Sequence, residues 1–234
     1  MKKLICLLTG VILFAAANAQ SLEEIVKKHS AASKSDQVAK IKTVRITGKM
    51  SAMGMEMPLE MIMKNPDKIK VIYNFSGQQM ISVFDGEKGY MMNPLTGSTN
   101  PVELKGEQLS QLTRNNVFTN EVMNSFDKKR LSYEGEEAVS GKPAYKLKIT
   151  IEGSAPGYLF IDKSSGLLVK ASTTVAQQGT TMNVETYLTD YKETNGLVYP
   201  MKTTAHANGM EAAVITFDQV EVNIPVEDSV FKVK

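Results

Sequence analysis

The stretch from Lys64 to Pro94, KNPDKIKVIYNFSGQQMISVFDGEKGYMMNP, decides the fold that we expect for this chain. Its first part, Lys68 to Phe75, alternates apolar and polar residues, which is the period of a half-buried β-strand. Ser76-Gly77 predicts a turn. Asp85-Gly86 predicts a second hairpin with a type I′ turn, in which both central residues need a positive φ. The stretch is therefore expected to form three consecutive antiparallel strands.

Alternating runs and turn dipeptides continue on both sides of this stretch. We expect strands over Thr43 to Ala52 and Met55 to Met63 before it, and a meander from Leu131 to Val222 after it. Asn195-Gly196 and Asn208-Gly209 predict further tight hairpins. Together these signals predict about ten or eleven strands in one antiparallel sheet, and a sheet of this width should curl strongly.

Two segments carry helical rather than strand signals. Ser21 to Ile41 begins with a residue that can cap a helix, and two glutamates follow where the helix dipole favours acidic groups. Leu104 to Phe126 is expected to form short, interrupted helices that need an apolar surface to rest on. We expect a polar loop over Leu95 to Pro101, and we expect the tail from Ile224 to Phe231 to pack along a sheet edge.

One predicted strand has an unusual composition. Every second residue from Met55 to Met63 is apolar, and four of these five residues are methionines. Methionine is flexible and polarisable, so it fills irregular gaps in a core and also lines surfaces that accept varied apolar partners. Both interpretations stay open, because one face of a strand can be core at one end and cavity lining at the other.

The first 19 residues have the pattern of a secretory signal peptide. Lys2-Lys3 gives the basic start, Leu4 to Ala17 the apolar run, and Ala17-Asn18-Ala19 a small-residue cleavage site. A transmembrane anchor is the alternative, but the run is shorter than the roughly 20 residues that span a bilayer. We therefore predict a periplasmic protein, cleaved near Ala19, with a single domain over residues 20–234.

The composition argues against several kinds of function. Loss of residues 1–19 would lower the 27 Lys and Arg to 25, against 25 Asp and Glu, so a neutral mature chain has no electrostatic reason to bind nucleic acid. It would also remove the single cysteine, and the two histidines, His29 and His206, are far apart, so no metal site is predicted. No nucleophile, phosphate-loop or dinucleotide motif is present, so we predict no catalytic residue and no cofactor.

The stretch that opened this section also resembles the LolA family of periplasmic lipoprotein carriers, with its LolB and RseB-type relatives. The resemblance lies in the corner Lys64-Asn65-Pro66, the amphipathic strand after it, and the ordered series from Phe84 to Pro94. It implies a mainly β fold with a few helices (α+β): a single wide antiparallel sheet curled into an incomplete half barrel, covered by an N-terminal helix and short inserted helices. The family has an arginine before the corner proline, where this chain has Asn65, so the role of that arginine is not carried over.

In that family, helices plug the open side of the half barrel and move when acyl chains enter. The resemblance thus implies a monomeric carrier of lipoprotein acyl chains or other lipid, with an inner-membrane release complex and an outer-membrane acceptor as candidate partners. A lipid-binding or lipoprotein-sensing module on the same fold is the alternative, and an enzyme with converging carboxylates is a third hypothesis. The residues expected to line the acyl cavity are Met55, Met57, Met61, Met63, Ile69, Val71, Tyr73, Phe75, Leu109, Leu112 and Phe118.

Overall fold

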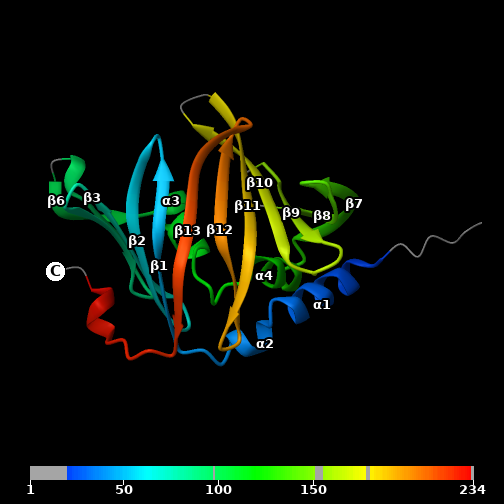
Figure 1. Ribbon diagram of the computed structural model, residues 1–234, viewed down its shortest axis with the longest axis horizontal. Helices are drawn as coiled ribbons and strands as arrows, with labels where there is room; N and C mark the ends of the chain where they lie inside the picture. Colours follow the sequence, from blue (N-terminus) through cyan, green and yellow to red (C-terminus); the bar gives the residue numbers. More distant parts are fainter. Residues whose placement is uncertain (1–19, 97, 151–154, 178–179, 233–234) are drawn as a thin grey trace, which may run out of the picture.

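The computed structural model describes residues 20–232, except 97, 151–154 and 178–179, and the structural statements below refer to this part of the chain (Figure 1). It contains thirteen strands in one antiparallel sheet, in the order β6-β5-β4-β3-β2-β1-β13-β12-β11-β10-β9-β8-β7. The strands are β1 (Thr43–Ala52), β2 (Met55–Lys64), β3 (Lys68–Phe75), β4 (Gln78–Phe84), β5 (Gly89–Asn93), β6 (Ser98–Leu104), β7 (Leu131–Val139), β8 (Lys142–Ile149), β9 (Gly157–Asp162), β10 (Leu168–Gln177), β11 (Thr180–Thr194), β12 (Leu197–Ala207) and β13 (Met210–Val222).

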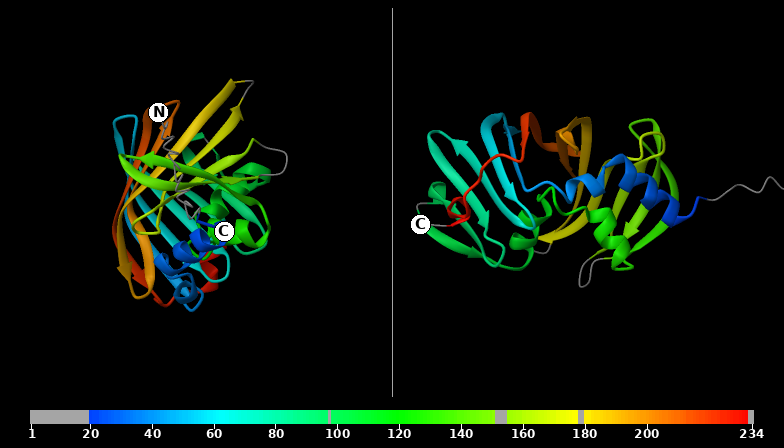
Figure 2. Two further views of the ribbon diagram at one scale, coloured as in Figure 1. Left: turned by 90° about the vertical axis from the view of Figure 1, so that its right-hand side faces the viewer. Right: turned by 90° about the horizontal axis from the view of Figure 1, so that it is seen from below.

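The sheet consists of two meanders joined along one pair of strands. Consecutive strands are neighbours throughout β1–β6 and throughout β7–β13, and β13 returns to pair with β1, with Val222 opposite Val44. The two edges, β6 and β7, do not meet, and Figure 2 shows the sheet curled into an open crescent. This confirms the predicted fold class, a wide antiparallel sheet that forms a half barrel.

Four α-helices accompany the sheet among the described residues: α1 (Leu22–Ala32), α2 (Ser35–Val38), α3 (Gly106–Arg114) and α4 (Glu121–Asp127). Two short 3₁₀ helices, η1 (Pro94–Thr96) and η2 (Asp228–Phe231), complete the elements. The predicted cap of α1 is present as a capping box, in which Ser21 Oγ accepts from the Glu24 N–H and the Glu24 carboxylate accepts from the Ser21 N–H. None of the described helices is long and apolar enough to cross a membrane.

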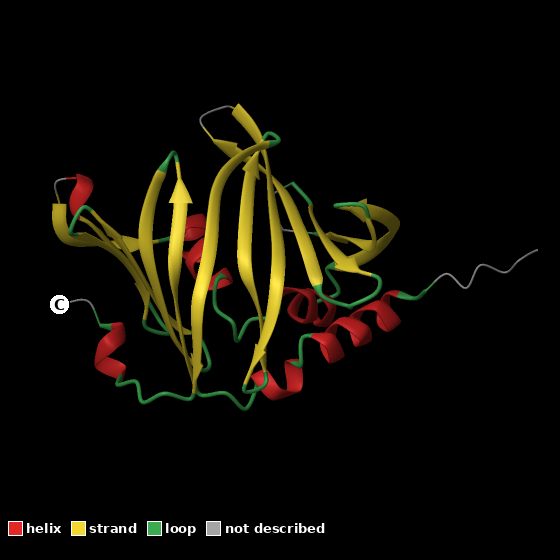
Figure 3. Ribbon diagram, in the orientation of Figure 1, coloured by secondary structure: helices red, strands yellow, loops and turns green. Residues whose placement is uncertain are grey.

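The concave face of the sheet holds two apolar clusters, and α1, α3 and α4 lie on this side (Figure 3). The first, called here the methionine cluster, comes from β1–β3, β6, β12, β13 and α3. Its buried members are Ile41, Val44, Ile46, Leu59, Met61, Met63, Ile69, Val71, Leu104, Leu112, Leu197, Met201 and Phe217. The second, called the anchored cluster, comes from β7–β9, α1 and α4. Its buried members are Ile25, Val26, Val122, Leu131, Tyr145, Leu147, Ile149, Leu159 and Ile161.

The two ends of the sheet are covered differently. At one end, called proximal, α1 and α2 lie against the turns: His29 Nδ1 of α1 lies 3.0 Å from the Gly166 carbonyl in the β9–β10 turn, and Gln37 of α2 lies beside Gly196 in the β11–β12 turn. At the opposite, distal end are the β1–β2, β3–β4 and β12–β13 turns, because alternate turns of an antiparallel meander share one end. Figure 1 shows these tips pointing away from α1 and α2.

Three sequence expectations need correction. The segment from Leu95 to Pro101 is not a loop, because it contains part of η1 and the start of β6, an edge strand that pairs only with β5. The sheet therefore has thirteen strands rather than ten or eleven. An edge strand has one neighbour and needs no continuous apolar alternation, so its polar residues concealed it.

The turn after Phe84 also differs from the prediction. It is a four-residue loop rather than a type I′ turn, because Asp85 Oδ1 accepts from the N–H groups of Glu87 and Lys88 at 2.8 and 2.7 Å. These bonds hold the pKa of Asp85 below its ordinary value, and the bond from the Lys88 N–H contributes most.

The C-terminal tail does not follow a sheet edge. Its helix η2 lies beside the interior strand β3, and Asp228 pairs with Lys64 and Lys68 at 2.6 and 2.9 Å. Phe231 is buried, as the expected anchor should be. Hydrogen bonds from the two lysines lower the pKa of Asp228 to about 2, and the bond from Lys64 contributes most.

Candidate functional site

The methionine-rich face of β2 lies on the concave side of the sheet. Met63 is fully buried, and Met61 and Met57 are 5% and 7% exposed. Directly opposite residues share a face, and the neighbours across from Met61 are Ile46 of β1 and Val71 of β3. The face is therefore the middle of an apolar surface that extends over several strands.

This apolar surface is closed at its proximal end and partly open at its distal end. Met63 and its cross-strand partners Val44 and Ile69 are fully buried. Towards the distal end, Met50 and Tyr73 are only partly buried, and Met55 is 41% exposed. An apolar chain entering from the distal end would meet apolar side chains along its whole path.

The element that covers this surface is α3 with the linker to α4. Leu112 is buried, while Leu109, Val117 and Phe118 pack against the methionine cluster. The Val117 N–H donates to the sulfur of Met63 at 3.4 Å. The cover therefore rests directly on the deepest methionine.

The seat of α3 depends on one glycine. A Cβ at Gly89 would lie 2.5 Å from Leu109 Cδ1, so β5 leaves room for this leucine only because it carries no side chain there. The helix itself is weakly fixed, since Lys105 provides no side-chain cap, Gly106 has a φ of 54°, and Leu112 is the single buried residue. Leu109, seated at Gly89, and the buried Leu112 are thus the α3 side chains that pack against the methionine cluster.

Eight of the eleven predicted lining residues meet in the methionine cluster. These are Met61, Met63, Ile69, Val71, Tyr73, Leu109, Leu112 and Phe118. Met57 is buried outside that cluster, Phe75 is half-buried, and Met55 lies exposed at the distal rim.

β12 and β13 also contribute to this surface, and their contribution was not predicted from the sequence. Met201, Phe217 and Ile215 belong to it, and the Tyr199 and Phe217 rings meet edge to face with centroids 5.2 Å apart. The alternation in these strands was visible, but the β1–β13 pairing that brings them beside the methionines was not.

One polar side chain is buried beside the cover without full pairing. Asn116, in the linker between α3 and α4, is 3% exposed, and its Oδ1 accepts from the Phe118 N–H at 3.0 Å. Its Nδ2 has no hydrogen-bond partner among the described residues. A buried amide that keeps a free donor is an energetic cost, and a ligand carbonyl could remove that cost.

The anchored cluster is fixed by a polar network that the methionine cluster lacks. His29 Nδ1 lies 3.0 Å from the Gly166 carbonyl, and His29 Nε2 lies 3.3 Å from Asn120 Nδ2. Asn120 caps α4 by accepting from the Met123 N–H, and its Nδ2 also donates to Ser33 Oγ and Ser35 Oγ. The network thus links α1, α2, α4 and the β9–β10 turn.

Burial sets the electrostatics on both sides of the concave face. It lowers the pKa of His29, although the bonds to Gly166 and Asn120 oppose this, so the ring is neutral with Nδ1–H as the donor. Burial raises the pKa of Tyr73 and, further, those of Tyr191 and Tyr199 above their ordinary value. The residues of the methionine cluster are thus uncharged, and the surface is suited to holding an apolar group rather than to acid–base chemistry.

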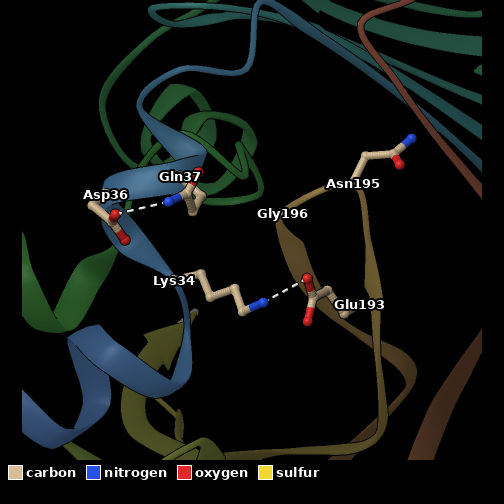
Figure 4. Close-up of a pocket in the computed structure, with 6 residues that line it drawn as sticks. All are labelled: Lys34, Asp36, Gln37, Glu193, Asn195 and Gly196. Carbon is tan, nitrogen blue, oxygen red and sulfur yellow. Dashed lines mark hydrogen bonds and ion pairs between the residues drawn. The ribbon is translucent and has the colours of Figure 1, made fainter.

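A polar pocket and a metal site are the alternatives to this apolar surface. A pocket of about 470 Å³ lies between α2 and the β11–β12 turn, lined by Lys34, Asp36, Gln37, Glu193, Asn195 and Gly196 (Figure 4). Its lysine and Glu193 already form an ion pair, and its Gln37 donates to Asp36, so its polar groups serve one another. Among the described residues, no group of three His, Cys, Asp or Glu side chains could hold a metal ion.

No protein-family model and no curated protein matches the sequence, but solved structures match the fold. A DUF1329 family protein from Desulfovibrio piger has a TM-score of 0.61 at 13% identity, over 89% of this chain and 97% of its own. A putative outer membrane lipoprotein-sorting protein domain from Vibrio parahaemolyticus has a TM-score of 0.60 at 12% identity, over 90% and 95%. A LolA superfamily protein from Nitrosomonas europaea has a TM-score of 0.57 at 13% identity, over 92% and 98%. The chain therefore has a LolA-like fold.

Proposed function

We propose that this protein is an exported carrier that holds the acyl chains of a lipoprotein or lipid between the methionine cluster and α3. The observation that carries the proposal is the uncharged, methionine-rich concave surface under a weakly fixed helix. Two proteins of the same fold are named for lipoprotein sorting or for the LolA superfamily, which supports a role in binding acylated cargo. Residues 1–19, with the pattern of a secretory signal, support a periplasmic location.

Cargo binding would use apolar burial and would require α3 to move. Each methylene removed from water contributes roughly 0.8 kcal/mol, so an acyl chain of ordinary length would offset the burial of Leu109 and Leu112 that α3 gives up. Methionine side chains adapt to different shapes, which would make the site tolerant of acyl length and unsaturation. Val117 and Phe118 would follow α3, and the bond to the Met63 sulfur would break on opening.

Binding of a fluorescent fatty-acyl probe would test this site. Met57→Asp places a charge where the buried part of the surface meets its open part, and we expect it to reduce probe affinity at least a hundredfold, because an unpaired charge at an apolar contact is costly. Met53→Asp makes the same change on the same hairpin at a residue that is 92% exposed, and its affinity should equal that of the parent. Equal affinities in Met57→Asp and Met53→Asp would refute the proposed cavity.

A second candidate function is a lipid-binding or sensing module that does not pass its ligand on. The observation in its favour is Asn65, which stands where the resembling carriers have arginine. Its amide donates to the backbone carbonyls of Ala39 and Ile41, so it fixes the segment between α2 and β1. Transfer of a bound acyl probe from the protein to acceptor vesicles separates the two functions, since a carrier should release its ligand and a sensor should retain it.

A further inference from the structure

The large apolar side chains that remain exposed are concentrated at one end of the molecule. Among the described residues there are five of them, Met53, Met55, Leu95, Val102 and Met210. Met53, Met55 and Met210 flank the β1–β2 and β12–β13 turns, and Leu95 lies in the β5–β6 connection, so these four share the distal end. Only Val102 lies elsewhere, within the edge strand β6.

Met53 has no conformational reason to occupy its position. Five two-residue turns have a positive φ at both central positions: Met53-Gly54, Ser76-Gly77, Ser140-Gly141, Asn195-Gly196 and Asn208-Gly209. Asparagine is the residue best suited to the first of these positions, whereas a long side chain there is uncommon. Four of the turns carry serine or asparagine at their first central position. The fifth, the distal turn between β1 and β2, carries methionine instead.

Met53 has no packing reason either, since it is 92% exposed. A residue that is unfavourable for its backbone and touches nothing in the fold points to a contact outside the fold. Met210, at the tip of the neighbouring hairpin, is 73% exposed. β1 and β13 are paired, so the two tips lie at the same end of adjacent hairpins (Figure 1).

These methionines continue the apolar surface of the concave face. Met55 lies on the same side of β2 as Met57, one position nearer the turn on that face. Met210 lies at the start of β13, opposite Ala207. The apolar path therefore runs from Met53 through Met55 to the buried Met57. The nearest acidic residues, Glu56 and Glu211, follow Met55 and Met210 directly, and Glu56 pairs with Lys49 on the other side of β2.

We propose that the distal end docks on a lipid surface, with Met53 and Met210 entering the region between the headgroups and the acyl chains. Two turns that each expose one methionine offer few of the roughly 20 to 30 residues that each partner contributes to a stable protein interface. Flexible, uncharged apolar side chains on such tips can instead insert into a bilayer without shape matching. This inference rests on the proposed carrier function for its purpose: the docked end would join the acyl region of the membrane to the methionine cluster.

Vesicle flotation tests the proposal with the protein that begins near Gln20, because an intact apolar segment from residue 4 to 17 would itself bind lipid. Vesicles of phosphatidylcholine alone should suffice, and high salt should not release the protein, since the two methionines proposed to insert are uncharged. We expect Met53→Asn and Met210→Asn each to weaken vesicle binding about tenfold, the loss from one buried methionine side chain. Asparagine is also favourable in the Met53 turn, so this variant should fold.

The matched control is Val102→Thr, which changes an apolar residue that is also exposed, at 57%, but lies away from the distal end, and which keeps the β-branched shape. It should bind vesicles like the parent. The chain has no tryptophan, so Met53→Trp, Met210→Trp and Val102→Trp are each single-fluorophore reporters. We expect vesicles to shift the emission of the first two to the blue and to leave the third unchanged.

Three results would overturn the proposal: no vesicle binding by the parent, unchanged binding by the Met53→Asn, Met210→Asn double variant, or the same emission shift at position 102. The first of these would leave a protein partner as the reason for the exposed methionines. Binding of the acyl probe in the absence of vesicles should be unchanged in the asparagine variants. A failure of docking and a failure of the proposed acyl cavity are therefore distinguished.

Discussion

The two halves of the concave face are built for different tasks. The anchored cluster is covered by α1 and α4, both capped by side chains and joined through His29 and Asn120. The methionine cluster is covered by α3, which has no side-chain cap and buries a single residue, Leu112. Local opening requires little energy where few apolar contacts and weak caps hold an element. From this difference we infer that α3 is the part of the cover that opens while the rest of the fold stays in place.

The composition of the two clusters agrees with this division. Branched residues such as Ile25, Ile149 and Ile161 have few rotamers and fill fixed spaces in the anchored cluster. The methionine cluster has Met61, Met63 and Met201 among its buried members, and methionine adopts several shapes at similar energy. Such side chains suit a surface that, under the proposed function, is filled by α3 in one state and by cargo in another.

The largest expected effect is a difference in the free energy of unfolding between a variant in α1 and a variant in α3. Ile25→Ala in α1 removes a fully buried side chain and should lower the free energy of unfolding by about 2 to 5 kcal/mol. Leu109→Ala in α3 removes a partly buried one and should cost less than about 1.5 kcal/mol, because α3 can detach without unfolding the sheet. Urea unfolding of both variants gives the two numbers. Equal losses would contradict the division of the cover into a fixed part and a mobile part.

The second prediction changes the seat of α3 without changing α3. Gly89→Ala places a methyl group against Leu109 Cδ1, so the Leu109 side chain should leave its seat and α3 should be held less tightly while the sheet remains intact. We expect faster association of the acyl probe, by about tenfold if the contact is worth about 1.4 kcal/mol. Stopped-flow fluorescence measures this rate.

A contrasting glycine provides the control for that experiment. A Cβ at Gly48 would lie 2.2 Å from the Thr216 carbonyl oxygen, and backbone atoms cannot yield as a side chain does. Gly48→Ala should therefore lower stability without accelerating probe binding. If Gly89→Ala also lowered stability and left the rate unchanged, α3 would be part of the rigid core.

Much of this architecture follows from local sequence, and its limits are specific. The strand bounds of β1 and the turns at Ser76-Gly77 and Asn195-Gly196 were predictable from alternation and turn chemistry. The edge strand β6 was missed because one-sided pairing leaves no alternating pattern. The partners of the methionines on β13 were missed because the β1–β13 register joins residues from opposite ends of the chain, and no local signal encodes it.

The third prediction concerns the pH dependence of the anchored half. The pKa of His29 is lower in the folded protein than its ordinary value of 6.5, so the unfolded chain binds more protons in that range. Its contribution to stability should be complete above pH 6.5 and decline as the pH falls below that value. Thermal unfolding of the parent and of His29→Gln at neutral and acidic pH measures it. The stability difference between the two should shrink in acid, and a constant difference would show that the pKa of His29 is the same in the folded and the unfolded chain.

The smallest expected effect tests whether the unpaired amide of Asn116 serves a ligand. Asn116→Leu removes a buried donor that has no partner, and it also removes the acceptor of the Phe118 N–H. The lost hydrogen bond should be offset by the removed desolvation cost of about 1 to 3 kcal/mol, so the empty protein should lose little stability. If Nδ2 donates to cargo, the variant should bind a fatty-acyl ester less tightly while its affinity for a hydrocarbon probe of equal length stays the same. Parallel loss of both affinities would assign Asn116 to the shape of the linker instead. The methionine cluster would then recognise only the length of the apolar chain, and the selection of cargo would depend on residues outside the cavity.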